Sequence, residues 1–380
     1  MRNLRRHFLL DPQVVFLNHG SFGATPKPVF QAYQRWQREL ESQPVEFLGR
    51  RFPGLMQIAR KSLAEYLNTS ADNLVYTPNV TVSVNIVARS LKLGPGDEVL
   101  TTDHEYGACD RTWHFLSREN RFVYKNQPIA VPIDSTEAFI ESLWKGVTSR
   151  TKVIFLSHIT SPTAVIFPIA EVCARARQEG ILTLIDGAHA PGQIHLDIPA
   201  IGADFYGGNL HKWLCAPKGA GFLYARPEVQ VLLKPLIVSW GYESETPSSS
   251  TFIDLHEWTG TRDYAAYLSV PSAIEFQADH DWDNVRIDCH ERVFEVQRRI
   301  CALTGLSPLN RNDSLFGQFV SIPLPDETDI LKLKEDLYKR YSIEVPLIQW
   351  NKRKLIRVSI QGYNIMRDVN ALHKALQALL

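Results

Sequence analysis

Two residues suited to covalent catalysis, Asp186 and Lys212, each follow a short apolar segment of the kind that forms a buried strand. Asp186 ends the run ILTLID, and Lys212 lies just beyond ADFYGG, between His211 and Trp213. Ligands of open α/β sheets bind beyond the carboxyl ends of the strands, so both side chains are predicted to lie at a binding site. Each residue also fits a plain structural role: a helix cap or loop ion pair for Asp186, and a solvated position for Lys212.

A lysine that is shielded from water can attack a carbonyl group. A free lysine has a pKa near 10.4, and burial or nearby positive charge lowers it and releases the nucleophilic amine. Lysine combined with an acid suits pyridoxal phosphate, which needs a Schiff-base lysine and an acid that keeps its ring nitrogen protonated. The segment TPNVT offers a phosphate cradle, because a helix is predicted to begin near Val80 and Thr81, after Asn79. The same residues also fit an ordinary helix cap.

The elements that must position these residues alternate between strand-like and helix-like segments over the first two thirds of the chain. Helix-like runs at 135–147 and 169–180 separate apolar strands, which favours a mostly parallel sheet. The strands are predicted at 73–77, 97–102, 121–125, 152–159, 181–188, 203–208 and 219–225. The predicted fold is therefore α/β, with a large domain whose sheet is sandwiched by helices and a smaller C-terminal α+β lobe.

The domain boundaries follow the change in pattern near residue 265. We predict a large cofactor-binding domain over 16–262 and a small domain over 263–380, with residues 1–15 packing on the small domain. The polar segment 242–252 is predicted to form a loop between the two lobes.

Composition excludes several classes of partner. Lysine plus arginine balances aspartate plus glutamate at 41 each, which gives no electrostatic footprint for nucleic acid or an anionic membrane. The basic start is followed by too short an apolar run for a signal peptide, and no membrane span is predicted. The scattered cysteines indicate free thiols in the cytoplasm, with neither disulfides nor a metal site; they are Cys109, Cys173, Cys215, Cys289 and Cys301.

Taken together, LIDGAHAPGQIHLD and GGNLHKWLCAPKGAGFLY resemble the class V aminotransferase-like family of fold-type I pyridoxal-phosphate enzymes. Within that family, FLNHGSFGATPKPV, HEYGA and HKWLCAPKGAGFL are most similar to the isopenicillin N epimerase-like branch. The resemblance extends from Asn18 to the C-terminal IRVSIQGYN.

The resemblance implies a set of cofactor contacts. Lys212 would form the Schiff base, Asp186 would pair with the pyridinium nitrogen, and His189 would contact the phenolic oxygen. Many relatives carry asparagine at the position of Ser161, so its contact to the ring oxygen is expected to be changed or missing. Thr261 would reach the phosphate of a neighbouring subunit, which implies a homodimer with shared active sites. The phosphate would be held by Asn79, Val80, Thr81, Asn209 and His211.

The resemblance also implies the substrate contacts. Arg357 would grip the substrate carboxylate, a task for which a planar bidentate guanidinium is suited. Asn18 and Gly20 would line the substrate side. His104 or Tyr106 would lie near the exposed face of the ring, where either is a candidate for a second acid.

Several reactions remain open at this point. The branch favours epimerisation, in which Lys212 removes the α-proton of an amino acid; carbon–sulfur lyase and aminotransferase chemistry are alternatives. Cysteine desulfurase chemistry needs a cysteine on a small-lobe loop, yet 305–318 has none and Cys301 lies in a helix-like run. A non-catalytic cofactor-binding protein would be expected to have lost Lys212, Asp186 or Arg357. A nicotinamide dehydrogenase would need GxGxxG after its first strand, and NHGSFGATP has the wrong spacing.

Overall fold

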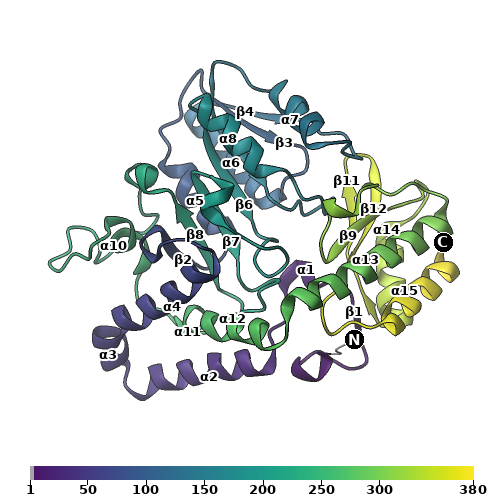
Figure 1. The fold of residues 1–380 in the computed structure, drawn as a ribbon, viewed down its shortest axis with the longest axis horizontal. Helices are drawn as coiled ribbons and strands as arrows, with labels where there is room; N and C mark the ends of the chain where they lie inside the picture. The colour runs from purple at the N-terminus through teal and green to yellow at the C-terminus, as the bar shows by residue number, and fades with distance from the viewer. Residues whose placement is uncertain (1–3) are drawn as a thin grey trace.

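The computed structural model describes residues 4–380 and is built around a seven-stranded sheet (Figure 1). The strand order is β2–β8–β7–β6–β5–β3–β4, and all neighbours are parallel except β8, which runs antiparallel to β2 and β7. The predicted α/β class with a mostly parallel sheet is thereby confirmed. The strands are β2 (Leu74–Thr77), β3 (Glu98–Thr102), β4 (Val123–Gln127), β5 (Thr151–Ser157), β6 (Leu182–Gly187), β7 (Phe205–Asn209) and β8 (Gly221–Ala225).

Helices cover both faces of this sheet because its central strands are apolar on both sides. In β5, Val153 and Phe155 belong to one buried cluster, while Ile154 and Leu156 belong to the cluster on the opposite face. The first cluster includes side chains of α5 (Val80–Ser90) and α6 (Gly107–Asn120); the second includes those of α7 (Thr136–Trp144) and α8 (Ile169–Gln178). Strands buried on both faces in this way are typical of parallel sheets.

The small lobe is an antiparallel three-stranded sheet with helices against it (Figure 1). Its strand order is β11–β12–β9, and helix α13 contacts both β9 and α15. The elements are α13 (Trp282–Thr304), β9 (Phe319–Leu324), α14 (Ile330–Tyr341), β11 (Leu347–Trp350), β12 (Arg353–Ser359) and α15 (Met366–Leu379).

The N-terminal segment joins this small lobe. Strand β1 (Val15–Phe16) pairs in parallel with β10 (Ile343–Glu344), and the Leu4 amide donates to the Gly362 carbonyl at 3.0 Å. The Phe8 and Tyr363 rings lie edge to face, with centroids 4.9 Å apart. These contacts join the N-terminal segment to residues of the small lobe. The predicted packing of residues 1–15 on the small domain stays a prediction, and residues 1–3 lie outside the described part.

The remaining helices lie mainly along one side of the large sheet. Helices α11 and α12 contact α2 and α4, so the chain just after residue 262 still packs on the large lobe, and the predicted boundary there stays a prediction. The segment predicted to lie between the lobes instead leads into α10, which packs on β2 at the edge remote from the small sheet (Figure 1). The helices are α1 (His19–Phe22), α2 (Lys27–Ser42), α3 (Pro44–Glu46), α4 (Phe52–Tyr66), α9 (Ile198–Ile201), α10 (Thr251–Glu257), α11 (Ala265–Leu268) and α12 (Val270–Asp279).

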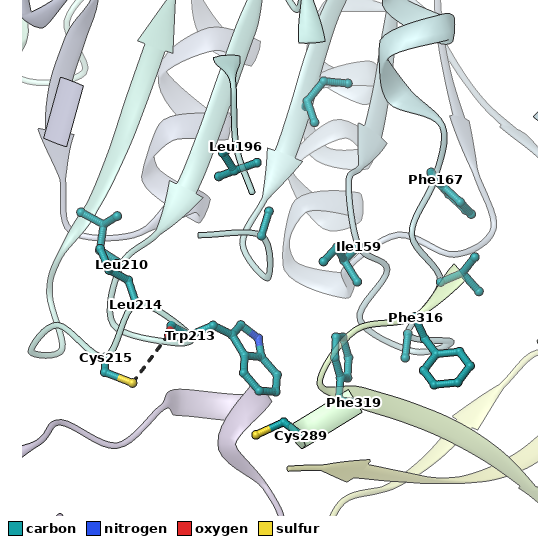
Figure 2. Close-up of a cluster of buried hydrophobic side chains, with 14 of the residues drawn as sticks. Ile159, Phe167, Leu196, Leu210, Trp213, Leu214, Cys215, Cys289, Phe316 and Phe319 are labelled. Carbon is teal, nitrogen blue, oxygen red and sulfur yellow. Dashed lines mark hydrogen bonds between the residues drawn. The ribbon is translucent and has the colours of Figure 1, made fainter. Parts of the chain in front are cut away.

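A buried cluster fills the junction between the two sheets. Figure 2 shows the Trp213 indole of the large lobe facing the Phe319 ring of β9; their centroids are 5.5 Å apart. Cys289 of α13 and Cys215 lie beside them, and both are fully buried. This packing fixes the small lobe close to the carboxyl ends of the large sheet. Within residues 4–380, no helix combines the length and apolarity that crossing a membrane requires.

Candidate active site

A cavity of about 330 Å³ opens where the carboxyl ends of the large sheet meet the small lobe. Its walls come from α1, the starts of α5 and α6, the loops after β5, β6 and β7, and strand β12. The lining residues are Gly20, Ser21, Phe22, Asn79, Val80, Thr81, Tyr106, Ser161, Ala188, Asn209, His211, Lys212 and Arg357. Ten of these are among the residues predicted for the site.

Lys212 lies in the turn after β7 and places its amine inside this cavity. Its Nζ is 3.1 Å from the Nε2 atom of His189, a residue of the loop after β6. Burial, reinforced by the positive charge of Arg357, lowers the pKa of Lys212 to about 8. The amine is therefore shielded and far more often unprotonated near neutral pH than a solvated lysine, as the prediction requires.

Asp186 lies at the end of β6, directly behind the residues that line the cavity. Its Oδ1 accepts the Ala188 amide at 2.8 Å, and Oδ2 accepts the thiol of Cys109 at 3.5 Å. Burial raises the pKa of Asp186, although the Lys212 cation opposes that effect. Among residues 4–380 this carboxyl forms no ion pair, so it is suited to pair with a protonated nitrogen of a ligand that enters beside it.

His189 also lies behind the lining, where it bridges the lobes. Its ring stacks on Phe319 of β9 with centroids 4.8 Å apart, and its Nδ1 accepts the Trp213 indole N–H at 3.1 Å. Burial lowers the pKa of His189 well below its ordinary value, with further lowering by the Lys212 charge. The imidazole is therefore neutral.

The start of α5 forms an anion cradle at one end of the cavity. Asn79 caps the helix by accepting the Val82 amide at 3.1 Å, and the Asn209 Oδ1 accepts the Val80 amide at 2.9 Å. The Thr81 amide, at the second helical position, has no partner inside the helix, and Thr81 lines the cavity. Three predicted phosphate contacts thus share one helix N-terminus, whose dipole favours an anion.

His211 lines the same cavity. Burial lowers the pKa of His211 to about 4, with a further contribution from the adjacent Lys212 cation. Its Nδ1 donates to the Ala220 carbonyl at 3.3 Å, so the one N–H of the neutral ring is already engaged, and a contact of His211 to a phosphate stays a prediction.

Arg357 of β12 is the cationic group that the small lobe contributes. It is only 5% exposed, and burial lowers the pKa of its guanidinium to about 10. One terminal nitrogen donates to the Ser161 carbonyl and hydroxyl, both at 2.9 Å, and the other donates to the Ser21 hydroxyl at 3.0 Å. Its Nε has no partner in the described part of the chain. A buried guanidinium held only by neutral groups is arranged to receive a carboxylate.

Ser161 is a partner of Arg357. It lines the cavity, as expected, but its carbonyl and hydroxyl both accept from Arg357. The hydroxyl is therefore engaged by the guanidinium, and the expected change in its contact to a ring oxygen stays a prediction.

Asn18 acts one step further from the cavity than predicted. It is not among the lining residues; instead its Oδ1 accepts the Ser21 hydroxyl at 2.5 Å and its Nδ2 donates to Glu344 at 2.9 Å. Through Ser21 it orients Arg357, so the predicted direct substrate contact is corrected to a positioning role. Gly20 does line the cavity, and its amide donates to the Ser359 hydroxyl at 3.2 Å.

His104 and Tyr106 lie in different environments: His104 is buried outside the cavity lining, and Tyr106 lines the cavity. His104 is fully buried, its ring nitrogens are engaged by the Thr163 hydroxyl at 2.7 Å and the Ile129 carbonyl at 2.9 Å, and it does not line the cavity. With both nitrogens engaged, His104 has no free nitrogen for proton transfer, and the expected place near the ring of a cofactor stays a prediction. Tyr106, 45% exposed, lines the cavity at its mouth.

Thr261 lies on the outside of the molecule. It is exposed and does not line this chain's cavity. Nearby, Asp263 accepts a hydrogen bond from Gln37 of α2 at 2.8 Å, which places the segment against that helix. A role toward a neighbouring subunit stays a prediction.

Sequence reasoning placed Asn18 and Gly20 at the site but missed three other residues of α1, which are His19, Ser21 and Phe22. Ser21 and Phe22 line the cavity, and His19 Nε2 donates to the Lys212 carbonyl at 3.0 Å, while the Tyr363 hydroxyl meets His19 Nδ1 at 2.9 Å. The signal was present in NHGSFG, whose glycines permit close approach: a Cβ on Gly23 would lie 1.9 Å from the His211 carbonyl oxygen.

The aminotransferase class-V family model matches residues 15–372. The chain belongs to this family. It is similar to an isopenicillin N epimerase of Amycolatopsis lactamdurans, 36% identical over 390 residues that cover 99% of this chain and 98% of the relative. It is also similar to an L-cysteine desulfhydrase of Arabidopsis thaliana, 27% identical over 410 residues that cover 97% and 88% of the two chains.

The fold is matched by solved structures. A C-DES mutant with glycine covalently linked to its PLP cofactor superposes with a TM-score of 0.87, covering 99% of both chains at 21% identity. At this identity the likeness establishes the shared fold. The family membership and this fold together identify the chain as a fold-type I, class-V protein of the pyridoxal-phosphate-dependent kind.

Proposed function

We propose that this protein binds pyridoxal phosphate and acts at the α-carbon of an amino-acid substrate as an epimerase. The observation that carries the proposal is the pairing, in one cavity, of a buried amine with a buried guanidinium that lacks a carboxylate partner in the described residues. Lys212 supplies the amine, and Arg357 supplies the carboxylate anchor. The similarity to isopenicillin N epimerases supports the epimerase assignment.

The side chains around the cavity fit the cofactor group by group. The α5 N-terminus with Asn209 suits the phosphate, and Asp186 suits a protonated ring nitrogen. His189 is available to the phenolic oxygen, because its Nε2 already faces the Lys212 amine. Bound in this cavity, pyridoxal phosphate would supply an aldehyde that reacts with amines and a ring that withdraws electrons from the substrate α-carbon.

Lys212 is positioned to act as the general base. A free Lys212 amine would remove the α-proton of a bound substrate, and a pKa of about 8 suits this task close to neutral pH. Arg357 fixes the substrate carboxylate and so presents one face of the α-carbon to Lys212. The small lobe and the Trp213–Phe319 contact exclude water from this side.

Tyr106 is the candidate acid for the opposite face. The residue lines the mouth of the same cavity that Lys212 and Arg357 line. Return of a proton to the face opposite the one that lost it inverts the α-carbon. Because His104 is fully engaged elsewhere, Tyr106 is the group we assign to this step.

A carbon–sulfur lyase is the second candidate. It needs the same α-proton removal, followed by departure of a β-substituent, and the similarity to an L-cysteine desulfhydrase favours it over transamination. Persulfide chemistry on a protein cysteine is disfavoured, because four of the five cysteines are buried and Cys301 lies within α13. A purely cofactor-binding role is also disfavoured, since Lys212, Asp186 and Arg357 are all retained.

We also propose that the protein acts as a homodimer. Thr261 is exposed away from its own cavity, as a residue supplied to a partner's phosphate site would be.

The test combines a covalent trap with an isotope measurement. Protein reconstituted with pyridoxal phosphate should be yellow, and borohydride should fix the cofactor to Lys212 in wild type but not in Lys212→Ala; exposed Lys234→Ala is the matched control. In heavy water, an amino-acid substrate should gain α-deuterium and change configuration. Normal turnover by Lys212→Ala would overturn the proposal, and release of a β-substituent without inversion would support the lyase instead.

A further inference from the structure

A thiol touches the carboxyl group that is proposed to face the cofactor ring. Cys109 lies in the first turn of α6, is fully buried, and directs its S–H to Asp186 Oδ2 at 3.5 Å. The other oxygen, Oδ1, is already fixed by the Ala188 amide. Oδ2 is therefore the oxygen with the greater remaining capacity to accept from a ligand, and Cys109 shares it.

The thiol is held in its neutral, donating form. Burial raises the pKa of Cys109 well above its ordinary value, and the Asp186 charge raises it further. Of the two partners, the thiol has the higher ordinary pKa, so Cys109 donates and Asp186 accepts.

A second carboxyl borders the same pair. Glu105 Oε1 accepts the Thr102 hydroxyl at 2.7 Å, and Oε2 accepts the Ser157 amide and hydroxyl at 2.8 and 2.6 Å. Ser157 is the register partner of Asp186 between β5 and β6. Burial raises the pKa of Glu105 to about 8, and Asp186 contributes to that rise. Because its oxygens are engaged by Thr102 and Ser157, Glu105 leaves Cys109 as the side-chain donor to Asp186.

We propose that Cys109 is a positioning residue that orients Asp186 Oδ2 and weakens the attraction of this carboxylate for the ring proton of the cofactor. This inference rests on the proposed function. A hydrogen bond from the thiol stabilises the ionised carboxylate and makes it a weaker base, so a proton shared between Asp186 and a ring nitrogen lies further toward the nitrogen than it would without the thiol. The thiol thus helps the ring to withdraw electrons from the α-carbon.

Simple packing is the rival explanation, since buried cysteines often serve as small hydrophobes. The two explanations predict different effects for substitutions of Cys109 by residues of similar volume. Packing predicts that Cys109→Ser and Cys109→Ala differ only in stability. The positioning role predicts an ordered electronic effect, because serine donates a stronger hydrogen bond than cysteine and alanine donates none.

The first arm of the test uses the apoprotein and needs no cofactor. The infrared S–H stretching band of Cys109, assigned by its loss in Cys109→Ser, should lie at a hydrogen-bonded frequency and shift in Asp186→Ala. Cys173→Ala is the matched control, because Cys173 is equally buried but lies on α8, which packs on the opposite face of the sheet from α6. A Cys109 band at the free-thiol frequency, unmoved in Asp186→Ala, overturns the inference.

The second arm uses protein loaded with ¹⁵N-labelled pyridoxal phosphate. Relative to wild type, the ring-nitrogen chemical shift should move away from the protonated limit in Cys109→Ala and toward that limit in Cys109→Ser. Cys173→Ala should match wild type. Identical shifts in all four proteins overturn the tuning role. Failure of the wild type to take up cofactor would refute the proposed function, and the apoprotein arm would still decide the Cys109–Asp186 contact.

Discussion

The indole N–H of Trp213 donates to His189 Nδ1 at 3.1 Å, on the far side of the ring from Lys212. An indole nitrogen only donates, so His189 Nδ1 must accept and a neutral ring must carry its proton on Nε2. That proton points at the Lys212 amine, 3.1 Å away, and an ammonium group has no lone pair to receive it. Trp213 therefore fixes the tautomer of His189, and that tautomer favours the uncharged form of the Lys212 amine.

Cofactor capture should follow the titration of Lys212. The folded-state pKa is lowered from 10.5 to about 8, so about a tenth of the amine is reactive at pH 7. The rate of covalent uptake by apoprotein should rise with pH and level off above about 8, as measured by stopped-flow absorbance. A rate that still climbs tenfold per unit beyond about pH 9 would show a solvated lysine.

Trp213→Phe should raise the midpoint of that titration. Without the indole donor, His189 can adopt the other tautomer and accept from a charged Lys212, which stabilises the ammonium form. We expect a shift of up to about one pH unit, equivalent to one hydrogen bond. Trp144→Phe, which removes an indole bonded to Glu179 at 2.7 Å, is the control. An unchanged midpoint would argue against the relay through His189.

Arg357→Lys should weaken substrate binding far more than it slows turnover. A lysine keeps the charge but cannot bond a carboxylate in the bidentate manner while also contacting Ser21 and Ser161. The KM for amino-acid substrates should rise roughly 10- to 100-fold, with kcat changed much less. Arg353→Lys, on the exposed end of the same strand, should leave both constants unchanged. Equal KM values for the two variants would remove Arg357 from the substrate site.

Tyr106→Phe should separate proton removal from inversion. Lys212 would still exchange the α-proton with solvent, but the acid on the opposite face would be missing. Epimerisation should fall by roughly 10²- to 10⁴-fold while deuterium exchange with retention persists, as followed by chiral chromatography and mass spectrometry. The exposed Tyr242→Phe serves as the control. Parallel loss of exchange and inversion would point to a binding role.

Gly23→Ala should destabilise the protein through the Lys212 loop. Gly23 has φ +69°, and an added Cβ would lie 1.9 Å from the His211 carbonyl oxygen, so the backbone of that loop must move. Gly180→Ala provides a matched comparison, because φ is +70° there and no atom lies within 4 Å of the added Cβ. Thermal melts should show a loss of roughly 1 kcal/mol for Gly180→Ala and several kcal/mol for Gly23→Ala. Similar losses of stability in the two variants would mean that the positive φ, and not the contact with the His211 carbonyl, causes the destabilisation.

The sequence allowed good prediction of the features that local patterns control. Strand positions in the large sheet follow from apolar runs buried on both faces, and Asp186 and Lys212 follow from their places at strand ends. What escaped prediction depends on contacts between distant segments. The engagement of His104 by Thr163 and Ile129, and the route from Asn18 through Ser21 to Arg357, require residues far apart in sequence to meet.

The β1–β10 pairing has a consequence for biosynthesis. Helix α1, which carries Gly20 and buttresses Lys212, is translated before the strands of the large sheet, whereas its partners Glu344, Ser359 and Tyr363 are translated after them. A nascent chain on the ribosome can therefore assemble the large sheet but not a finished catalytic pocket. The contacts that hold α1 against Lys212 should therefore form only after β12 and Tyr363 have emerged from the exit tunnel, later than the strands of the large sheet.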